Sequence, residues 1–116
     1  MSKQALKAGV IGGGFIGPVH VEALRRLGVT VSALCDLPGR VEAAAKRLGI
    51  PEFYSEYHDL IRAPSVDVVH IASPNRYHYA MAMAALRAGK HCVCEKPLAM
   101  NTRQTAELAA EAKHRA

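Results

Sequence analysis

Three glycines near the start of the chain have the spacing of a phosphate-binding turn. Gly12, Gly14 and Gly17 form a G-x-G-x-x-G pattern within the run VIGGGFIG. The first glycine of such a pattern allows a tight turn out of a strand, the second lets a pyrophosphate approach the backbone, and the third lets the following helix pack closely. The amides that open the helix, here at Phe15 and Ile16, then face the anion together with the positive end of the helix dipole. We therefore predict a pyrophosphate site, with a ligand-free glycine turn as the alternative.

An acidic residue follows this turn at the distance that a dinucleotide requires. Asp36 ends a second apolar run, 19 residues after Gly17. A carboxylate in this position accepts hydrogen bonds from the ribose hydroxyls of adenosine. It also repels a 2′-phosphate, which favours NAD, whereas the nearby Arg40 leaves NADP open. Asp36 could also cap the helical segment that starts at Pro38, and the two roles are compatible.

Two further polar clusters follow the fourth and fifth apolar runs of the sequence. The first cluster contains Ser73, Pro74, Asn75 and His78, and the second contains Glu95 and Lys96. In a doubly wound sheet both clusters lie at the carboxyl edge, where ligands bind. We therefore expect them to point into the same crevice as the glycine turn. For His78 there are two alternatives, a hydrogen bond to the cofactor or a cap on its own helix.

Lys96 has the side chain best suited to redox chemistry in this crevice. When a hydride leaves a carbinol carbon, the hydroxyl loses its proton, and a nearby ammonium stabilises the negative charge that develops on the oxygen. A lysine that is partly desolvated beside a cationic nicotinamide has a lowered pKa, which suits a proton relay. We therefore predict Lys96 as the catalytic residue. The alternative is a structural ion pair with Glu95 or Asp59.

Strand-like and helical patterns alternate along the whole chain, with helices ending at Gly28, Gly49 and Gly89. Strands are predicted over residues 6–11, 29–35, 52–54, 66–72 and 91–94, and helices over residues 15–27, 39–48, 56–62, 76–88 and 102–114. In the second strand, Val29, Val31, Ala33 and Cys35 are expected to share one apolar face. This alternation predicts an α/β fold with a doubly wound, mostly parallel sheet of the Rossmann type. The expected strand order is 3-2-1-4-5, with the sixth strand missing.

The composition limits the partners of the protein. The 116 residues suit one domain and carry a net charge of +5, but the cations form isolated pairs such as Arg25-Arg26. Neither a nucleic acid nor a membrane surface is expected as a partner, and no apolar stretch is long enough to span a bilayer. The three cysteines, without histidines at ligand spacing, predict no metal site. An odd cysteine count and the lack of a signal peptide indicate the cytoplasm.

Taken together, the glycine turn, Ser73-Pro74-Asn75-x-x-His78 and Glu95-Lys96-Pro97 resemble the glucose–fructose oxidoreductase, inositol dehydrogenase and rhizopine-catabolism (Gfo/Idh/MocA) family. The resemblance covers nearly all of the chain. It implies a dinucleotide-binding Rossmann domain over residues 1–116, with Lys96 near the nicotinamide and substrate and Glu95 contacting the cofactor or ordering the lysine. It also makes a cis Lys96–Pro97 bond an open alternative, because that isomer would turn the lysine toward the cofactor.

The same resemblance implies hydride transfer to or from a sugar, cyclitol or similar small molecule. It further implies a C-terminal substrate and oligomerisation domain that is absent here. We therefore expect weak cofactor binding without turnover from this chain alone, and a homo-oligomer that covers the exposed edge of the fifth strand. The first alternative is a non-catalytic module that senses dinucleotides, and the second is an interaction domain that has lost its ligand.

Overall fold

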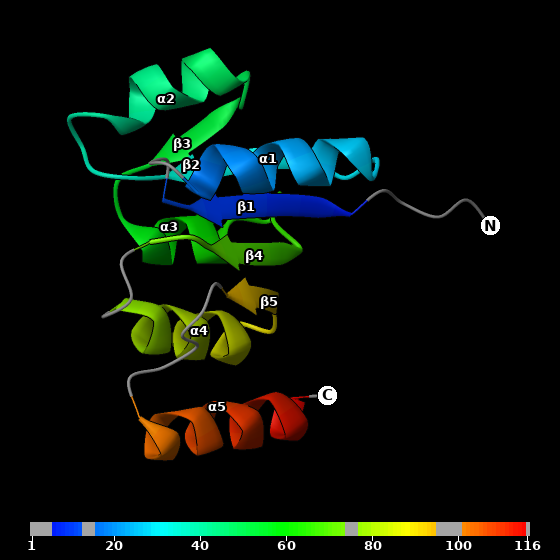
Figure 1. The fold of residues 1–116 in the computed structure, drawn as a ribbon, viewed down its shortest axis with the longest axis vertical. Helices are drawn as coiled ribbons and strands as arrows, with labels where there is room; N and C mark the ends of the chain where they lie inside the picture. Colours follow the sequence, from blue (N-terminus) through cyan, green and yellow to red (C-terminus); the bar gives the residue numbers. More distant parts are fainter. Residues whose placement is uncertain (1–5, 13–15, 74–76, 95–100, 116) are drawn as a thin grey trace.

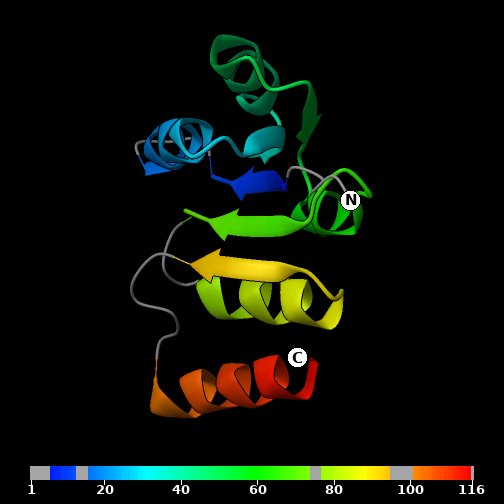
Figure 2. The same cartoon turned by 90° about the vertical axis from the view of Figure 1, so that its right-hand side faces the viewer.

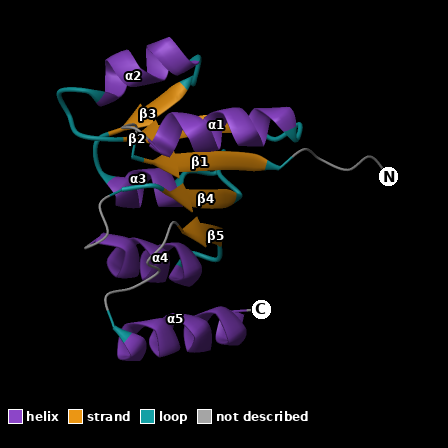
Figure 3. Ribbon diagram, in the orientation of Figure 1, coloured by secondary structure: helices purple, strands orange, loops and turns teal. Residues whose placement is uncertain are grey.

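Strands and helices alternate along the chain, as the apolar periodicity predicts (Figure 1, Figure 3). The computed structural model describes residues 6–12, 16–73, 77–94 and 101–115, without the side chains of Ile16 and Arg115. The strands are β1 (Lys7–Ile11), β2 (Thr30–Cys35), β3 (Glu52–Tyr54), β4 (Val68–Ile71) and β5 (His91–Cys94). The helices are α1 (Ile16–Arg26), α2 (Val41–Leu48), α3 (Tyr57–Arg62), α4 (His78–Arg87) and α5 (Thr102–Arg115). All ten predicted elements are confirmed, with boundaries that differ by at most two residues.

The described strands form one parallel sheet in the order β3-β2-β1-β4-β5, which confirms the predicted topology. The chain runs outward from the central β1 to β3, crosses back, and continues outward on the other side through β4 to β5. The register places Ile11 opposite both Cys35 and Ile71, so three strands end at the same level. This point, at which the direction of winding reverses, is where ligands bind in sheets of this type.

Helices cover both faces of the sheet and enclose two separate cores. Figure 2 shows α1 and α3 on opposite sides of β1. On the α1 and α2 face the buried side chains include Val10, Val21, Leu24, Leu34 and Val41. On the α3, α4 and α5 face they include Leu60, Val69, Ile71, Met81 and Leu108. Both faces of the sheet bury branched aliphatic residues, as a parallel sheet requires.

The apolar face predicted for the second strand is wrong in detail, because β2 contains a bulge. The register shifts between Ala8 and Gly9, whose partners are Val31 and Ala33, so that Ser32 is skipped. Val31 therefore packs into one core, whereas Ala33 and Cys35 pack into the other. Ser32 is buried, and its hydroxyl donates to the carbonyl oxygen of Ser65 over 2.6 Å. A bulge reverses the faces of the residues that follow it.

The ends of the helices follow the predicted signals. The three terminating glycines have positive φ angles of 81° at Gly28, 67° at Gly49 and 76° at Gly89. At the start of α5, the side-chain oxygen of Asn101 accepts the backbone N–H of Gln104 over 2.9 Å, which is an N-cap bond. Among the described helices, none has the length and apolar character needed to cross a bilayer.

Candidate dinucleotide site at the carboxyl edge

Backbone hydrogen bonds continue beyond the strand ends and hold three loops together at the carboxyl edge. The N–H of Gly12 donates to the carbonyl oxygen of Cys35 over 2.7 Å, and the N–H of Ala72 donates to that of Ile11 over 2.8 Å. The N–H of Asp36 donates to the carbonyl oxygen of Tyr54 over 3.2 Å. The first residues after β1, β2 and β4 are therefore fixed next to one another, where the parallel register predicts them.

Two of the three glycines of the predicted phosphate turn occupy positions that only glycine fits. Gly12 has a φ of +104°, and a Cβ atom there would lie 2.8 Å from the carbonyl oxygen of Ala72. A Cβ atom on Gly17, which is buried in the first turn of α1, would overlap the carbonyl oxygen of Gly12. The chain thus turns tightly out of β1 and packs the helix start against the strand end. This close packing fits the glycine requirements of a pyrophosphate-binding turn.

Asp36 lies at the end of β2 with its carboxylate held in place. Its Oδ1 accepts the N–H of Leu37 over 2.8 Å and pairs with Arg40 Nη2 over 3.2 Å. The side chain of Asp36 is 9% exposed, whereas that of Arg40 is 61% exposed. The alternative role of Asp36 as a helix cap is wrong, because α2 begins at Val41 with Arg40 in the N-cap position.

A cleft of about 290 Å³ opens at this edge of the sheet. That volume is near the lower end of the range for small-molecule sites, so the cleft suits part of a larger ligand. Its walls come from the segments that follow β1, β2, β3 and β4, together with the start of α4. The lining includes Gly12, Asp36, Arg40 and Ser73 among the predicted residues, and Leu37, Ser55, Glu56, Tyr57, Tyr77 and Met81 in addition.

His78 supports the loop that follows β4. Its side chain is 1% exposed, and its Nε2 atom lies 2.8 Å from the carbonyl oxygen of Ser73. The hydroxyl of Ser73 in turn donates to Met81 Sδ over 3.2 Å. The capping alternative for His78 is wrong, since Tyr77 holds the N-cap position of α4. The buried imidazole positions Ser73 on the cleft wall, and direct contact of His78 with the cofactor stays a prediction.

Several predicted site residues lie outside the described part of the chain: Gly14, Phe15, Pro74, Asn75, Glu95 and Lys96. The Lys96–Pro97 bond belongs to the same undescribed segment, and only the backbone of Ile16 is described. The described strands nevertheless lead to these segments, because β1, β4 and β5 all run toward the same edge.

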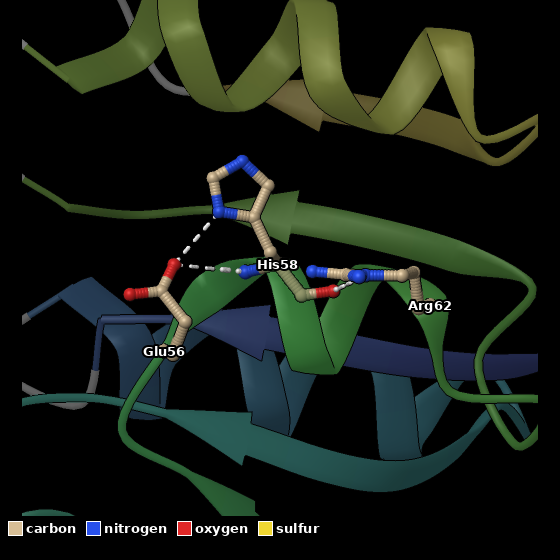
Figure 4. A network of polar contacts seen from close by, with 3 residues as sticks. All are labelled: Glu56, His58 and Arg62. Atoms are coloured by element: carbon tan, nitrogen blue, oxygen red, sulfur yellow. Dashed lines mark hydrogen bonds and ion pairs between the residues drawn. The ribbon is translucent and has the colours of Figure 1, made fainter.

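The sequence analysis did not identify the part of the cleft wall that follows β3. It consists of Ser55, Glu56 and Tyr57. Glu56 is the N-cap residue of α3, and its Oε1 atom accepts the N–H of His58 over 3.4 Å and lies 2.8 Å from His58 Nδ1 (Figure 4). These hydrogen bonds hold the pKa of Glu56 below its usual value. The topology contained the necessary signal, because every parallel strand delivers its following loop to one edge.

The chemistry of the cleft is that of binding rather than of nucleophilic attack by a thiol. Cys35 lines the cleft, but burial and the neighbouring Asp36 raise the pKa of its thiol to about 12. The thiol is therefore protonated at neutral pH, and the thiolate is the nucleophilic form. Within the described residues, no three His, Cys, Asp or Glu side chains gather to hold a metal ion. A glycine turn, an anchored carboxylate and an apolar wall suit a nucleotide with a phosphate group.

Comparison with known proteins agrees with this geometry. Residues 6–116 match the oxidoreductase family with an NAD-binding Rossmann fold. The chain is 42% identical over 106 residues to the inositol 2-dehydrogenase/D-chiro-inositol 3-dehydrogenase of Lactiplantibacillus plantarum, across 88% of this chain and 30% of that enzyme. An NAD binding oxidoreductase from Klebsiella pneumoniae superposes with a TM-score of 0.93 at 42% identity, across 97% of this chain and 32% of that one.

A levoglucosan dehydrogenase in complex with NADH superposes with a TM-score of 0.89 at 34% identity, across 95% of this chain and 32% of that one. The chain thus spans about 30% of the length of the curated relatives it matches. The family match covers β1 to α5, which includes every element that carries the cleft. The chain therefore belongs to the Gfo/Idh/MocA oxidoreductase family, and its fold is the NAD-binding Rossmann fold of that family.

Proposed function

We propose that this chain holds NAD along the carboxyl edge of its sheet, as the cofactor domain of an enzyme that transfers hydride to or from a hydroxyl or carbonyl carbon. The observation that carries the proposal is that Gly12, Asp36 and Ser73, from three different loops, line one cleft at the point where the winding reverses. A dinucleotide needs these three features in this order: a phosphate turn, a ribose acceptor and a wall beside the fourth strand.

Each described residue has a distinct part in binding. The amides that follow Gly12 take the pyrophosphate, with the dipole of α1 favouring the negative charge. Asp36 accepts the ribose hydroxyls with the carboxylate that Leu37 and Arg40 hold in place. Ser73 lines the wall beside β4, supported from behind by His78. When bound, the nicotinamide supplies the hydride donor or acceptor of the reaction.

Lys96 is proposed as the catalytic residue, and Glu95 as a residue that orders it or contacts the cofactor. An ammonium next to the reacting carbon stabilises negative charge on the substrate oxygen while the hydride moves, and can pass on the hydroxyl proton. The sequence supports this role, because Lys96 follows β5 by two residues and β5 runs toward the cleft edge. Pro74, Asn75, Gly14, Phe15 and Ile16 complete the proposed cofactor contacts.

The relatives support a polyol or sugar-like substrate for the whole enzyme. They include inositol dehydrogenases from several bacteria and a levoglucosan dehydrogenase. Residues beyond this chain must take part in choosing the substrate, because the chain spans about 30% of those relatives. The isolated chain is expected to bind cofactor without appreciable turnover. A dinucleotide sensor is the alternative, and Lys96 argues against it because a sensor has no need of a cation at the nicotinamide end.

Cofactor preference, location and assembly form part of the same proposal. Asp36 favours NAD. The exposed Arg40 beside it could bind a 2′-phosphate, so NADP is the alternative cofactor. A cytoplasmic location is supported by the odd number of cysteines, Cys35, Cys92 and Cys94. A homo-oligomer is supported by Val93 on the edge strand β5, which is 46% exposed.

A fluorescence titration with NADH and NADPH tests the proposal. We expect saturable NADH binding by the wild-type chain and a Kd that is about 10- to 100-fold higher for Asp36→Asn, since a hydrogen bond to a charged group contributes about 1.5–3 kcal/mol. Asp59→Asn is the matched control, because Asp59 is exposed on α3 and does not line the cleft. Absence of saturable binding, or equal losses in the two variants, would contradict the proposal.

A further inference from the structure

We propose that Glu56 is a specificity-determining residue that recognises the amino group on the purine ring of the dinucleotide. The proposal rests on the proposed function, because it concerns the far end of the same cleft. It adds a contact that selects adenine over purines with a carbonyl group at the same ring position.

The cleft has a direction that places the base next to Glu56. Gly12 marks the pyrophosphate end, and Asp36, joined to it through the bond from Gly12 N–H to the carbonyl of Cys35, marks the ribose. Beyond Asp36 the lining continues to Leu37 and to the loop after β3 that contains Glu56. The base is attached to that ribose on the side away from the pyrophosphate, so it extends toward this loop.

The walls of the cleft suit a flat aromatic ring. Leu37 is 60% exposed and Tyr77 is 42% exposed, although both are large apolar side chains that line the cleft. Tyr57, on the first turn of α3, stacks on the imidazole of His58 with ring centroids 4.1 Å apart. Exposed aliphatic and aromatic faces beside a polar rim are typical of sites that sandwich a ligand ring. A purine would cover them.

Glu56 presents one free carboxylate oxygen at the rim of this end. Its Oε1 atom is engaged by the backbone N–H and the Nδ1 atom of His58, as Figure 4 shows. Arg62 also comes near, donating from Nε to the carbonyl oxygen of His58 over 3.2 Å. Among the described residues, Oε2 of Glu56 has no hydrogen-bond partner. The side chain is 59% exposed, so a ligand can reach that oxygen.

The charge state of Glu56 makes the contact selective. The hydrogen bonds from His58 lower the pKa of Glu56, so the carboxylate is ionised throughout the neutral range. An ionised carboxylate only accepts hydrogen bonds. It therefore attracts the amino group of adenine and repels the carbonyl oxygen that guanine or hypoxanthine carries in the same place. Asp36 does not take this part, because its carboxylate is assigned to the ribose hydroxyls and Leu37 and Arg40 hold it at the end of β2.

Binding of two reduced dinucleotides separates this contact from the rest of the site. NADH is compared with reduced nicotinamide hypoxanthine dinucleotide, in which only the amino group is replaced by a carbonyl, by nicotinamide fluorescence. The variants are Glu56→Gln, which can both donate and accept, and Glu42→Gln as the control. Glu42 is exposed in the first turn of α2 and does not line the cleft.

We expect wild type and Glu42→Gln to prefer NADH by about 10-fold, the equivalent of one hydrogen bond. In Glu56→Gln this preference should fall to about 2-fold or less, with tighter binding of the hypoxanthine dinucleotide than in wild type. A structural role of Glu56 would weaken both ligands equally. If wild type and Glu56→Gln both bind the two dinucleotides strongly and with the same preference, the proposal for Glu56 alone is overturned. If wild type binds neither dinucleotide, the proposed function is overturned as well.

Discussion

The Nδ1 atoms of His20 and His70 lie 3.1 Å apart, which joins the phosphate-turn helix to the fourth strand. Their rings meet edge to face, with centroids 5.3 Å apart. One ring must donate and the other accept, so two fully protonated imidazoles cannot keep this contact. On the sheet, His70 lies between Val10 and Val93, which are both apolar. Both histidines therefore act as structural residues that tie α1 to β4.

The histidine pair should make stability depend on pH. Burial, followed by the charge of His20, lowers the pKa of His70 below the ordinary value of 6.5. Below pH 6.5 the unfolded chain takes up a proton that the folded chain disfavours, so the free energy of unfolding falls as the pH falls. Urea denaturation at pH 7.5 and pH 5.5 measures this loss.

His70→Asn should reduce that pH dependence, because an amide nitrogen can replace Nδ1 without titrating. His114→Asn, at an exposed position near the end of α5, is the control and should keep the wild-type dependence. An identical pH dependence in wild type and His70→Asn would show that the pair contributes nothing to it.

Gly17→Ala should disrupt the phosphate turn. The added Cβ would overlap the carbonyl oxygen of Gly12, so the start of α1 has to move away from β1. Overpacking of this kind lowers the free energy of unfolding by about 1–3 kcal/mol. Because the amides at the start of α1 are displaced, the variant should also bind NADH more weakly. Gly39→Ala is the control, because no atom lies within 4 Å of its added Cβ. Thermal unfolding and NADH titration of both variants check the prediction, and wild-type behaviour of Gly17→Ala would refute it.

Leu108→Ala should loosen the attachment of α5 to α4. Leu108 is 3% exposed and is the one described side chain of α5 that is buried. Two polar contacts also join the two helices, from Tyr79 to Glu107 and from Arg87 to Glu111. Removal of a buried leucine side chain costs about 2–5 kcal/mol. Leu27→Ala, at a position that is 80% exposed, should cost little, and equal denaturation midpoints for the two variants would be inconsistent with this packing.

The sequence was sufficient for the architecture because local and long-range signals agree. Glycines end the helices at Gly28, Gly49 and Gly89, and each separates a helical period from an apolar run. When strands alternate with helices, only a few sheet topologies are possible, because the crossover connections between parallel strands are right-handed. The order β3-β2-β1-β4-β5 follows from those rules together with the phosphate turn after β1.

The sequence was insufficient where side chains choose between close alternatives. A period of two places Val31 with Ala33, but the bulge at Ser32 separates them. The hydroxyl of Ser32 there bonds to Ser65, which is 33 residues away in the sequence. Likewise, the imidazole of His78 could form a hydrogen bond with several partners. In the folded chain it is buried and its Nε2 atom contacts the carbonyl oxygen of Ser73. Glu56 gave no signal by its type, and only the sheet topology brings it to the cleft.

Amide chemical shifts measured by NMR during titration with NADH test most directly whether the dinucleotide lies along the carboxyl edge. The account predicts that the largest changes among the described residues occur at Gly12, Gly17, Leu37, Tyr57 and Ser73, which belong to the cleft or to the turn that leads into it. Changes confined to Asp67, Gly89 and Lys90, at the opposite edge of the sheet, or no changes at all, would contradict it.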